Sequence, residues 1–595
     1  MLKRNRHVNN PKVVGQSVSG PGAAATSIGK GCSRMIAAPF QRRMPGVLLL
    51  LLFLAAVSSA AAPAMGGQAG GLKMLAATPP MGWNDWDHYQ CGFTAETIVS
   101  NAKALVTTGL AARGYKTVTI DDCWMQKGRD SNGNLQPDSG RFPLGMKPVA
   151  QAVHALGLKF GIYEDSGYAT CDGLAGSGQP KGGGKDHFFQ DARLFASWGV
   201  DYLKLDACNV YVPPGSSKDA AFRRAYARES AALKSVGRPI VFSESAPAYF
   251  QGTPEWYDVL SWVRYYGQLW REGSDMANYH AKDPDVPRFP SVLWNYAYNL
   301  PLGRFQKPGN WNDPDFIIGG DSGLSLAESR SQLALWSMMS APLILSSNVA
   351  KLSPQAIAIL GNRRVIAIDQ DPLGRMATLV RRSNAMDVLF KPLAAGNAAV
   401  AVLNRSDAPV RVSLHPADFG YAANSGCRLD ARNLWNGKRQ SGLSALEAEI
   451  APHHTAIWRV QPAAHCGRPS RTGAIIMTTN PDRYHHDIDS YSRCLAAPGQ
   501  VEACSGTRGE SWVVTSSGAL RSLGGRCLAV ANGKPVMEAC RAMSAQRWRY
   551  TLKGNLKSAH DHQCLSAAGP ANDPQSLAIE PCGHNQQNQI WSLPN

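Results

Sequence analysis

Short apolar runs alternate with amphipathic stretches from Leu75 to about Ile366, and many of these runs end in acidic residues. Residues 96–108 and 220–235 have the 3.6-residue apolar period of surface helices. Repeated strand–helix units over this length predict a parallel sheet closed into a (β/α)8 TIM barrel, to which we assign residues 72–368. An open doubly wound sheet is the alternative, but no glycine-rich phosphate loop follows the first predicted strand. The predicted strands are residues 116–122, 159–165, 201–206, 239–244, 259–264, 313–318 and 342–346.

The pattern changes after residue 368, where short alternating strands follow one another without a helical period. Residues 369–462 are therefore expected to form an antiparallel β-sandwich, and the loosely patterned residues 463–477 a linker. The predicted strands are residues 377–389, 398–403, 410–414 and 455–460.

The last part of the chain, residues 478–595, repeats one pattern three times. Each unit begins with Cys-Leu, contains a second Cys and closes on a Trp two residues after a Gln or Glu. Three such units predict a small fold with internal symmetry, and the Q-x-W signature resembles the ricin-B-type β-trefoil lectin module. The cysteine pairs are Cys494 and Cys504, Cys527 and Cys540, and Cys564 and Cys582, and the closing residues are Trp512, Trp548 and Trp591.

One apolar run, residues 47–57, has about half of the ~20 residues that a membrane-spanning helix needs. It follows Arg42-Arg43 and precedes the small residues SSAAAPA, as in a secretory signal peptide. Residues 1–62 are therefore expected to be a leader and signal peptide. The mature protein is expected to be secreted or periplasmic, with no membrane span.

Composition limits the partners and cofactors of the mature chain. The formal net charge of +17 includes eight basic and no acidic residues within 1–62, so +9 remains. A mild charge on so long a chain is weak evidence for nucleic-acid binding, and we expect none. Twelve of the 13 cysteines follow residue 62, and an even number in an exported protein indicates disulfides. No CxxC or HExxH motif occurs, so we expect no dedicated metal site and no cofactor.

Acidic residues cluster at the ends of the predicted barrel strands, where a barrel keeps its active site. Asp206 ends a strand on which Lys204 shares its face, and a nearby lysine keeps a carboxylate ionised, as a nucleophile requires. A buried salt bridge is the alternative for this pair. Asp275 lies four residues after Arg271 and is, by itself, an ordinary loop acid.

Two further acidic pairs, Asp121-Asp122 and Asp313-x-Asp315, end other strands of the predicted barrel. Adjacent carboxylates repel each other and require ligand hydroxyls, a cation or basic partners. Together with the nearby aromatic residues, including Trp124, they favour a sugar site, in which carboxylates accept hydroxyl hydrogen bonds and a ring stacks on the sugar. A divalent-metal site is the alternative.

Four motifs in this order resemble the retaining alpha-galactosidases of glycoside hydrolase family twenty-seven: PMGWNDW at 80–86, IDDCW at 120–124, YLKLD at 202–206 and WNDPD at 311–315. The resemblance covers about residues 72–460. It implies Asp206 as the nucleophile, Asp275 as the acid/base and an alpha-galactoside as the substrate. It further implies a galactose pocket that includes Trp86, Asp121, Asp122, Tyr163, Lys204, Glu244, Arg271 and Asp315. It also implies disulfides Cys91–Cys123 and Cys171–Cys208, which leaves Cys427 and Cys466 as a candidate third pair outside the trefoil.

The expected function is therefore a secreted retaining exo-glycosidase that removes terminal alpha-D-galactosyl residues by double displacement. Asp121 and Asp122 would accept hydrogen bonds from the axial O4 and from O6, the hydroxyls that identify galactose. A non-catalytic galactose-binding protein is the rival from another class. The intact pair of Asp206 and Asp275 argues against it, because a lectin needs neither an acid nor a nucleophile.

Two departures from the resembled families bear on specificity. Ser243-Glu244-Ser245 stands where Cys-Glu-Trp is usual, which opens the wall near the 2-position. An alpha-N-acetylgalactosaminidase or a beta-L-arabinopyranosidase on the same scaffold is therefore the alternative activity. In the trefoil, the acid that usually follows Cys-Leu is replaced by Ala496, Ala529 and Ser566, so we expect at best weak glycan binding there.

Overall fold

The computed structural model describes residues 74–276, 287–321, 323–478, 492–569, 574–584 and 586–594, and the predicted leader, residues 1–62, lies outside these ranges. In the described ranges, three folded parts follow one another along the chain. None of the helices described there has the length and apolar character needed to span a bilayer.

Eight parallel strands form the first part, and this confirms the predicted barrel. Each strand pairs with the next from β1 to β7, β1 also pairs with β8, and Ile317, just after β7, bridges Leu345 in β8. The strands are β1 (Met81–Asn84), β2 (Thr117–Ile120), β3 (Lys159–Asp165), β4 (Tyr202–Asp206), β5 (Val241–Glu244), β6 (Leu269–Arg271), β7 (Trp311–Asp313) and β8 (Leu343–Leu345).

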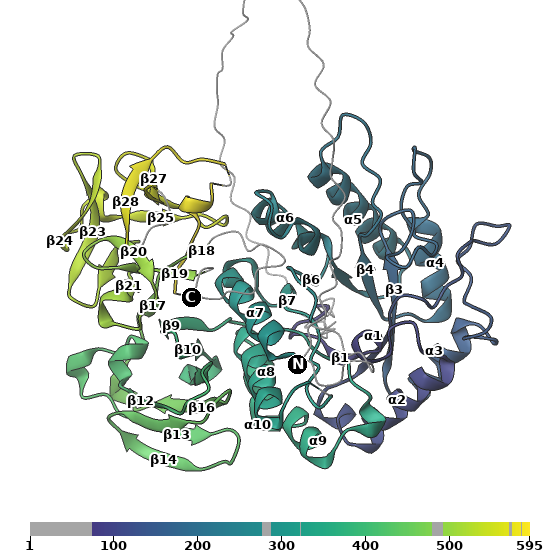
Figure 1. The fold of residues 1–595 in the computed structure, drawn as a ribbon, viewed down its shortest axis with the longest axis horizontal. Helices are drawn as coiled ribbons and strands as arrows, with labels where there is room; N and C mark the ends of the chain where they lie inside the picture. Colours follow the sequence, from purple (N-terminus) through teal and green to yellow (C-terminus); the bar gives the residue numbers. More distant parts are fainter. Residues whose placement is uncertain are drawn as a thin grey trace, which may run out of the picture. The chain divides into compact units, whose positions relative to one another are not determined.

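Helices cover the outside of these strands, as Figure 1 shows for α4 and α5 beside β3 and β4. Amphipathic helices pack their apolar faces against the sheet and turn their polar faces to water. The helices are α1 (Trp86–Tyr89), α2 (Ala95–Thr107), α3 (Met146–Ala155), α4 (Phe188–Trp198), α5 (Lys218–Ser235), α6 (Trp256–Val263), α7 (Phe289–Asn299), α8 (Leu326–Met339), α9 (Pro354–Leu360) and α10 (Arg363–Asp369).

The strand predicted at residues 259–264 is wrong, because this segment belongs to helix α6. Its buried residues include Trp256, Val259, Leu260 and Val263, which recur at the three- and four-residue spacing of one helix face. The run is apolar on nearly every side, so a short window of it has the composition of a buried strand. The sixth strand is the three-residue β6, which is too short to show a period.

The second part is an antiparallel β-sandwich, as predicted. It contains a six-stranded sheet and a two-stranded sheet around their own apolar core. The expected strand at 377–389 is a hairpin of two strands. The larger sheet contains β9 (Thr378–Arg382), β10 (Met386–Pro392), β11 (Ala398–Asn404), β13 (Leu429–Asn433), β14 (Arg439–Leu443) and β16 (Thr455–Pro462), and the smaller contains β12 (Val410–Leu414) and β15 (Leu446–Ile450).

A buried ionic group joins the sandwich to the barrel. Asp387 on β10 accepts two hydrogen bonds from the Arg382 guanidinium, at 2.9 and 2.6 Å, and one from the hydroxyl of Tyr296 on α7, at 2.9 Å. Although burial raises the pKa of Asp387, the charges of Arg382 and Arg405 hold it below its usual value. The carboxylate is therefore a charged anchor between the two parts.

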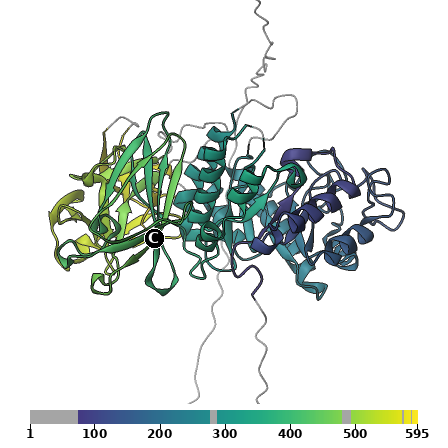
Figure 2. The ribbon, with the colours of Figure 1, turned by 90° about the horizontal axis from the view of Figure 1, so that it is seen from below.

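The third part is the predicted β-trefoil, and its threefold motif has a structural role. Trp512, Trp548 and Trp591 are buried, and each indole donates a hydrogen bond to the carbonyl of the Leu that follows a lobe's first Cys, at 2.6, 3.0 and 2.9 Å. Disulfides join Cys494 to Cys504, Cys527 to Cys540 and Cys564 to Cys582. In the described ranges, the segments after α10, which are green to yellow in Figure 2, contain strands, loops and short 3₁₀ turns but no α-helix.

Two sheets make up the trefoil in the described ranges. One contains β17 (Arg471–Ala474), β21 (Ser511–Val514), β22 (Leu520–Ser522), β23 (Arg526–Ala531) and β24 (Lys534–Ala539). The other contains β18 (Ile476–Thr478), β19 (Ser492–Ala496), β20 (Gln500–Ala503), β25 (Trp548–Tyr550), β26 (Leu556–Ser558), β27 (Cys564–Ala567), β28 (Gln575–Glu580) and β29 (Trp591–Ser592).

Residues 463–477, expected to be a linker, include two of these strands. Strand β17 pairs with β21, and β18 pairs with both β19 and β29. Cys466 forms a disulfide with Cys427 of the sandwich, so the start of the segment is fixed to the preceding part. Apolar and polar residues do not alternate clearly in this segment, which is why its sequence resembles that of a linker.

Candidate active site

A cavity of about 310 Å³ opens at the carboxyl ends of the barrel strands. Its lining contains all but one of the non-cysteine site residues expected from the sequence. These are Trp86, Asp121, Asp122, Tyr163, Lys204, Asp206, Arg271, Asp275 and Asp315.

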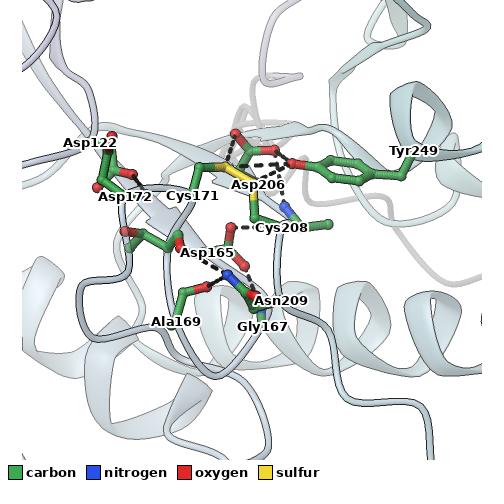
Figure 3. The surroundings of a disulfide bond; sticks show 12 residues. Asp122, Asp165, Gly167, Ala169, Cys171, Asp172, Asp206, Cys208, Asn209 and Tyr249 are labelled. Carbon is green, nitrogen blue, oxygen red and sulfur yellow. Dashed lines mark hydrogen bonds between the residues drawn. A yellow bond between two sulfur atoms is a disulfide. The ribbon is translucent and has the colours of Figure 1, made fainter. Parts of the chain in front are cut away.

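Asp206 ends β4 and accepts hydrogen bonds from three donors. The Tyr249 hydroxyl donates to Oδ1 at 2.6 Å (Figure 3). The backbone N–H of Ala207 donates to the same oxygen at 3.0 Å, and the Tyr163 hydroxyl donates to Oδ2 at 3.3 Å. Burial and the charge of Asp206 raise the pKa of both phenols, so each remains a donor. Donors of this kind favour the ionised form of a carboxylate.

Lys204 makes its direct ion pair with Asp121. Its Nζ lies 2.7 Å from Asp121 Oδ2, which also accepts a 2.6 Å hydrogen bond from the amide of Asn84 on β1. Burial lowers the pKa of Lys204, but the charges of Asp121 and Asp206 outweigh it and raise the pKa above its usual value. A permanently charged lysine is therefore paired with Asp121 and is close enough to Asp206 to feel its charge.

Asp122 is held by backbone donors in a tight turn. The N–H of Cys123 lies 2.6 Å from Oδ1, and the N–H of Asp172 lies 3.2 Å from Oδ2. Cys123 has a φ of +71° and forms a disulfide with Cys91. Burial raises the pKa of Asp122 to about 6. The carboxyl is thus fixed in direction and remains able to accept bonds from a ligand.

Arg271 joins Asp275 to Asp315 at the other side of the cavity. Its guanidinium lies 3.0 Å from Asp275 Oδ1 and 2.8 Å from Asp315 Oδ1, and Asp315 Oδ2 accepts a 2.6 Å bond from the N–H of Met276. The side chain of Asp275 is 69% exposed, whereas that of Asp315 is 3% exposed. Asp275 is therefore the carboxyl of this group that a leaving group can reach from outside.

The disulfide Cys171–Cys208 forms part of the cavity wall. It ties the loop after β3 to the end of β4, as Figure 3 shows beside Asp206. Asp165 at the end of β3 fixes the same loops, since it accepts bonds from the N–H groups of Gly167, at 2.6 Å, and Cys208, at 2.9 Å. Both disulfides that the family resemblance implies are thus present.

Within the ranges that the structure describes, two groups have metal-like spacing. One contains Cys171 and Cys208, and the other contains Cys91 and Cys123. In each group the two sulfurs are bonded to each other, so they are not thiolate ligands.

Glu244 is the expected pocket residue that does not line the cavity. It pairs with Leu205 in the sheet, and its buried carboxyl faces Gly267. Because Ser243 pairs with Lys204, whose side chain points inward, Glu244 must point outward. The direction of Glu244 thus depends on the register of β5 with β4, which alternation within β5 alone does not give.

Some lining residues were not named as site residues, although Ser245 belongs to the segment expected to form the wall near the 2-position. Ser245, Ala248 and Tyr249 line the wall after β5, and Asp87 and Phe316 complete the lining. Tyr249 lies on η2 (Ala246–Phe250), a 3₁₀ turn beyond the strand, so strand alternation does not place it. The available signal in the sequence was a tyrosine that closely follows β5, the neighbour of the strand that ends in Asp206.

The comparisons with known proteins agree with this geometry. Three family models match: "Alpha galactosidase A" at residues 78–371, "Alpha galactosidase C-terminal beta sandwich domain" at 383–460 and "Ricin-type beta-trefoil lectin domain" at 486–591. The "Alpha-galactosidase A" of Aspergillus niger is 36% identical over 532 residues, which is 88% of this chain and 92% of that protein. The "Alpha-galactosidase" of Oryza sativa subsp. japonica is 36% identical over 390 residues, or 65% of this chain and 86% of that protein.

Solved structures are similar over about two thirds of this chain. Alpha-galactosidase I from Mortierella vinacea has a TM-score of 0.57 and 28% identity over 65% of this chain and 98% of its own. A putative alpha-galactosidase/melibiase from Bacteroides fragilis has a TM-score of 0.57 and 32% identity over 65% of this chain and 80% of its own. With this fold, this cavity and relatives matched over most of their length, the chain belongs to the alpha-galactosidase family, glycoside hydrolase family twenty-seven.

Proposed function

We propose that this protein is a retaining exo-alpha-galactosidase. The observation that carries the proposal is the pairing of two different carboxyl groups in one cavity. Asp206 lies on a strand end among three hydrogen-bond donors, and Asp275 lies exposed beside Arg271. A nucleophile must be ionised and aimed, whereas an acid/base must exchange protons with the leaving group and with water.

In the proposed first step, Asp206 attacks the anomeric carbon and forms a carbon–oxygen bond. The bond between that carbon and the glycosidic oxygen breaks, and Asp275 gives its proton to that oxygen. In the second step, Asp275 takes a proton from water, which attacks the anomeric carbon and releases Asp206 as a carboxylate. Two displacements retain the configuration, so the second step releases galactose as its alpha anomer.

The polar lining supports galactose as the bound sugar. Asp121 and Asp122 present fixed carboxyl oxygens, and Lys204 adds a donor next to Asp121. We propose that these groups bind O4 and O6 and that Trp86 covers an apolar face of the ring. Because the partners are buried, a hydroxyl of the wrong configuration would leave them unpaired, which is costly.

Ser245 and Ala248 favour one second candidate, hydrolysis of alpha-N-acetylgalactosaminides. Both are small and line the cavity, so they leave room beside the sugar where a large side chain would close the wall. The activity panel therefore contains p-nitrophenyl alpha-galactoside, alpha-N-acetylgalactosaminide and beta-L-arabinopyranoside. The highest kcat/KM on the alpha-galactoside supports the proposal. The highest kcat/KM on either of the other two substrates replaces it with the corresponding activity. Binding without turnover of any of the three substrates leaves a galactose-binding protein.

We also propose that the protein is exported and that the lobes of its trefoil bind sugar weakly, if at all. Six disulfides fit an oxidising compartment. Ala496, Ala529 and Ser566 are buried and present no carboxylate to a ligand. Thiol titration of the native protein should find no free thiol among these twelve cysteines. Because the full chain also contains the proposed galactose pocket, calorimetry is done on the isolated tail, residues 469–595, and should give a millimolar Kd or weaker for galactose. Several free thiols, or a micromolar Kd, would overturn the respective statement.

A further inference from the structure

A second, larger hollow lies where the barrel meets the trefoil. Its volume is about 720 Å³, more than twice that of the active-site cavity. One wall comes from the start of α5, the end of η2 and helix α6, and the other from Leu552, Lys553 and His584 of the trefoil. We call this hollow the α5–α6 groove.

Specific contacts fix the trefoil wall of the groove. Arg304, just after α7, donates a 2.8 Å hydrogen bond to the carbonyl of Leu552. Asp258 on α6 forms an ion pair with Lys553, and its Oδ2 lies 3.3 Å from Nε2 of His584. The hydroxyls of Tyr257 and Thr478 lie 3.1 Å apart. These contacts thus hold the two walls of the groove in fixed positions relative to each other.

The lining combines an exposed aromatic ring with many polar groups. Tyr265 is 66% exposed, and the indole of Trp262 donates a 2.8 Å bond to Asp219. A ring offered to solvent beside hydroxyl, carboxylate and guanidinium groups is suited to sugar, which presents apolar faces and hydroxyl edges.

The charges of the groove balance. Three acidic side chains, Asp219, Glu255 and Asp258, face three basic ones, Lys218, Arg223 and Lys553. A nucleic acid or an acidic polymer would meet as many like charges as opposite ones, so neither gains a net attraction. An uncharged polyhydroxyl chain can use both signs, as donors and as acceptors.

The groove lies next to the active-site wall through η2. Ala248 and Tyr249 line the cavity, and the following residue, Phe250, lines the groove. Lys218 links the two, since its Nζ donates to the Tyr249 carbonyl at 2.7 Å and lies 4.6 Å from the centre of the Phe250 ring. A chain whose branch enters the cavity therefore has a polar, aromatic surface close to the entrance.

We propose that the α5–α6 groove binds a stretch of a neutral polysaccharide that carries alpha-galactosyl branches. The trefoil then acts in recognition as one wall of this groove, and not through pockets of its own lobes. The identity of the polymer rests on the proposed function, whereas the binding of a neutral glycan rests on the groove alone.

The test compares two groove variants, Tyr265→Ala and His584→Ala, with a matched control, Leu144→Ala. Leu144 is 81% exposed and lies outside both the groove and the cavity. The substrates are p-nitrophenyl alpha-galactoside and a galactomannan, a mannan chain with single alpha-galactosyl branches. We expect both groove variants to lower kcat/KM on galactomannan about two- to tenfold and to leave the aryl substrate unchanged. The control should change neither.

Two other outcomes have distinct meanings. Equal kcat/KM of all variants on galactomannan, with normal turnover of the aryl substrate, overturns the groove and leaves the proposed function intact. Absence of aryl turnover in the unmodified protein contradicts the proposed function, and affinity electrophoresis in galactomannan then decides the groove. Weaker retardation of the Tyr265→Ala protein supports glycan binding there, and equal retardation overturns it.

Discussion

Replacing Tyr249 by Phe removes one oxygen from the set of donors around the proposed nucleophile. That oxygen lies 2.6 Å from Asp206 Oδ1, a short distance for a bond to a carboxylate. In the second step Asp206 leaves as a carboxylate, so the donor stabilises charge that develops in the transition state. Ala207 and Tyr163 still donate to Asp206 in the variant.

A hydrogen bond to a charged group contributes roughly 1.5–3 kcal/mol, which predicts about a ten- to a hundredfold lower kcat for Tyr249→Phe. The loss should fall on release of the galactosyl-enzyme. Rapid mixing with p-nitrophenyl alpha-galactoside should therefore show a burst of p-nitrophenol before the slow steady rate. Tyr163→Phe is the matched control, and its 3.3 Å bond predicts a smaller loss.

A Tyr249→Phe enzyme with unchanged kcat would refute this account of Asp206. So would a large loss without a burst, because formation of the intermediate would then be the slowed step. Thermal unfolding of both variants should match the unmodified protein within about 1 kcal/mol, which separates a catalytic effect from misfolding.

Three further predictions concern stability and the trefoil. Asp387→Asn should lower the free energy of unfolding by about 3–5 kcal/mol, because the buried Arg382 guanidinium loses the negative charge that pairs with it. Since the pKa of Asp387 is held low, this contribution is present above its usual pKa and is lost as pH falls through the folded value. Acid titration of both proteins tests this, and equal unfolding curves would contradict it. Asp122 binds its proton more tightly in the folded state, with a pKa of about 6, so its stabilising contribution is greatest in acid and is lost as pH rises through 6. Chemical denaturation of Asp122→Asn should therefore show a smaller fall in the free energy of unfolding between about pH 4 and 7, by roughly 1–3 kcal/mol. An unaltered pH dependence would count against this prediction. A chain ending at Arg468 keeps the Cys427–Cys466 disulfide and loses the trefoil strands. Its kcat/KM on the aryl galactoside should stay within about twofold of that of the full chain. A tenfold loss in a folded truncated protein would show that the trefoil supports the active site.

The sequence predicts most of the barrel because its elements carry their own signals. Strand β3 has the bounds expected from the sequence, and α2 and α5 begin and end within two residues of the predicted limits. Strands of three or four residues, such as β1 and β6, are too short for a two-residue period to appear. The sequence of helix α6 predicts a strand because the helix is buried on almost every side, so its residues are apolar throughout.

The residues of the site likewise divide into those that the sequence predicts and those whose position depends on tertiary structure. Residues at strand ends, such as Asp121 and Asp206, were predicted because a barrel brings those ends together. Tyr249 was not, since it enters the cavity from a turn whose path depends on packing. Glu244 was placed in the pocket by resemblance, although the register with Leu205 turns it away. The partner of Lys204, which lies on another strand, also depends on tertiary structure.

Trapping the covalent intermediate tests the central claim most directly. A 5-fluoro-alpha-galactosyl fluoride slows both steps and has a good leaving group, so the galactosyl-enzyme should accumulate. Peptide mapping by mass spectrometry should then place one fluorogalactosyl group on Asp206, and the Asp206→Ala protein should acquire none. A label on another residue, or no label in an enzyme that turns over p-nitrophenyl alpha-galactoside, would contradict double displacement through Asp206.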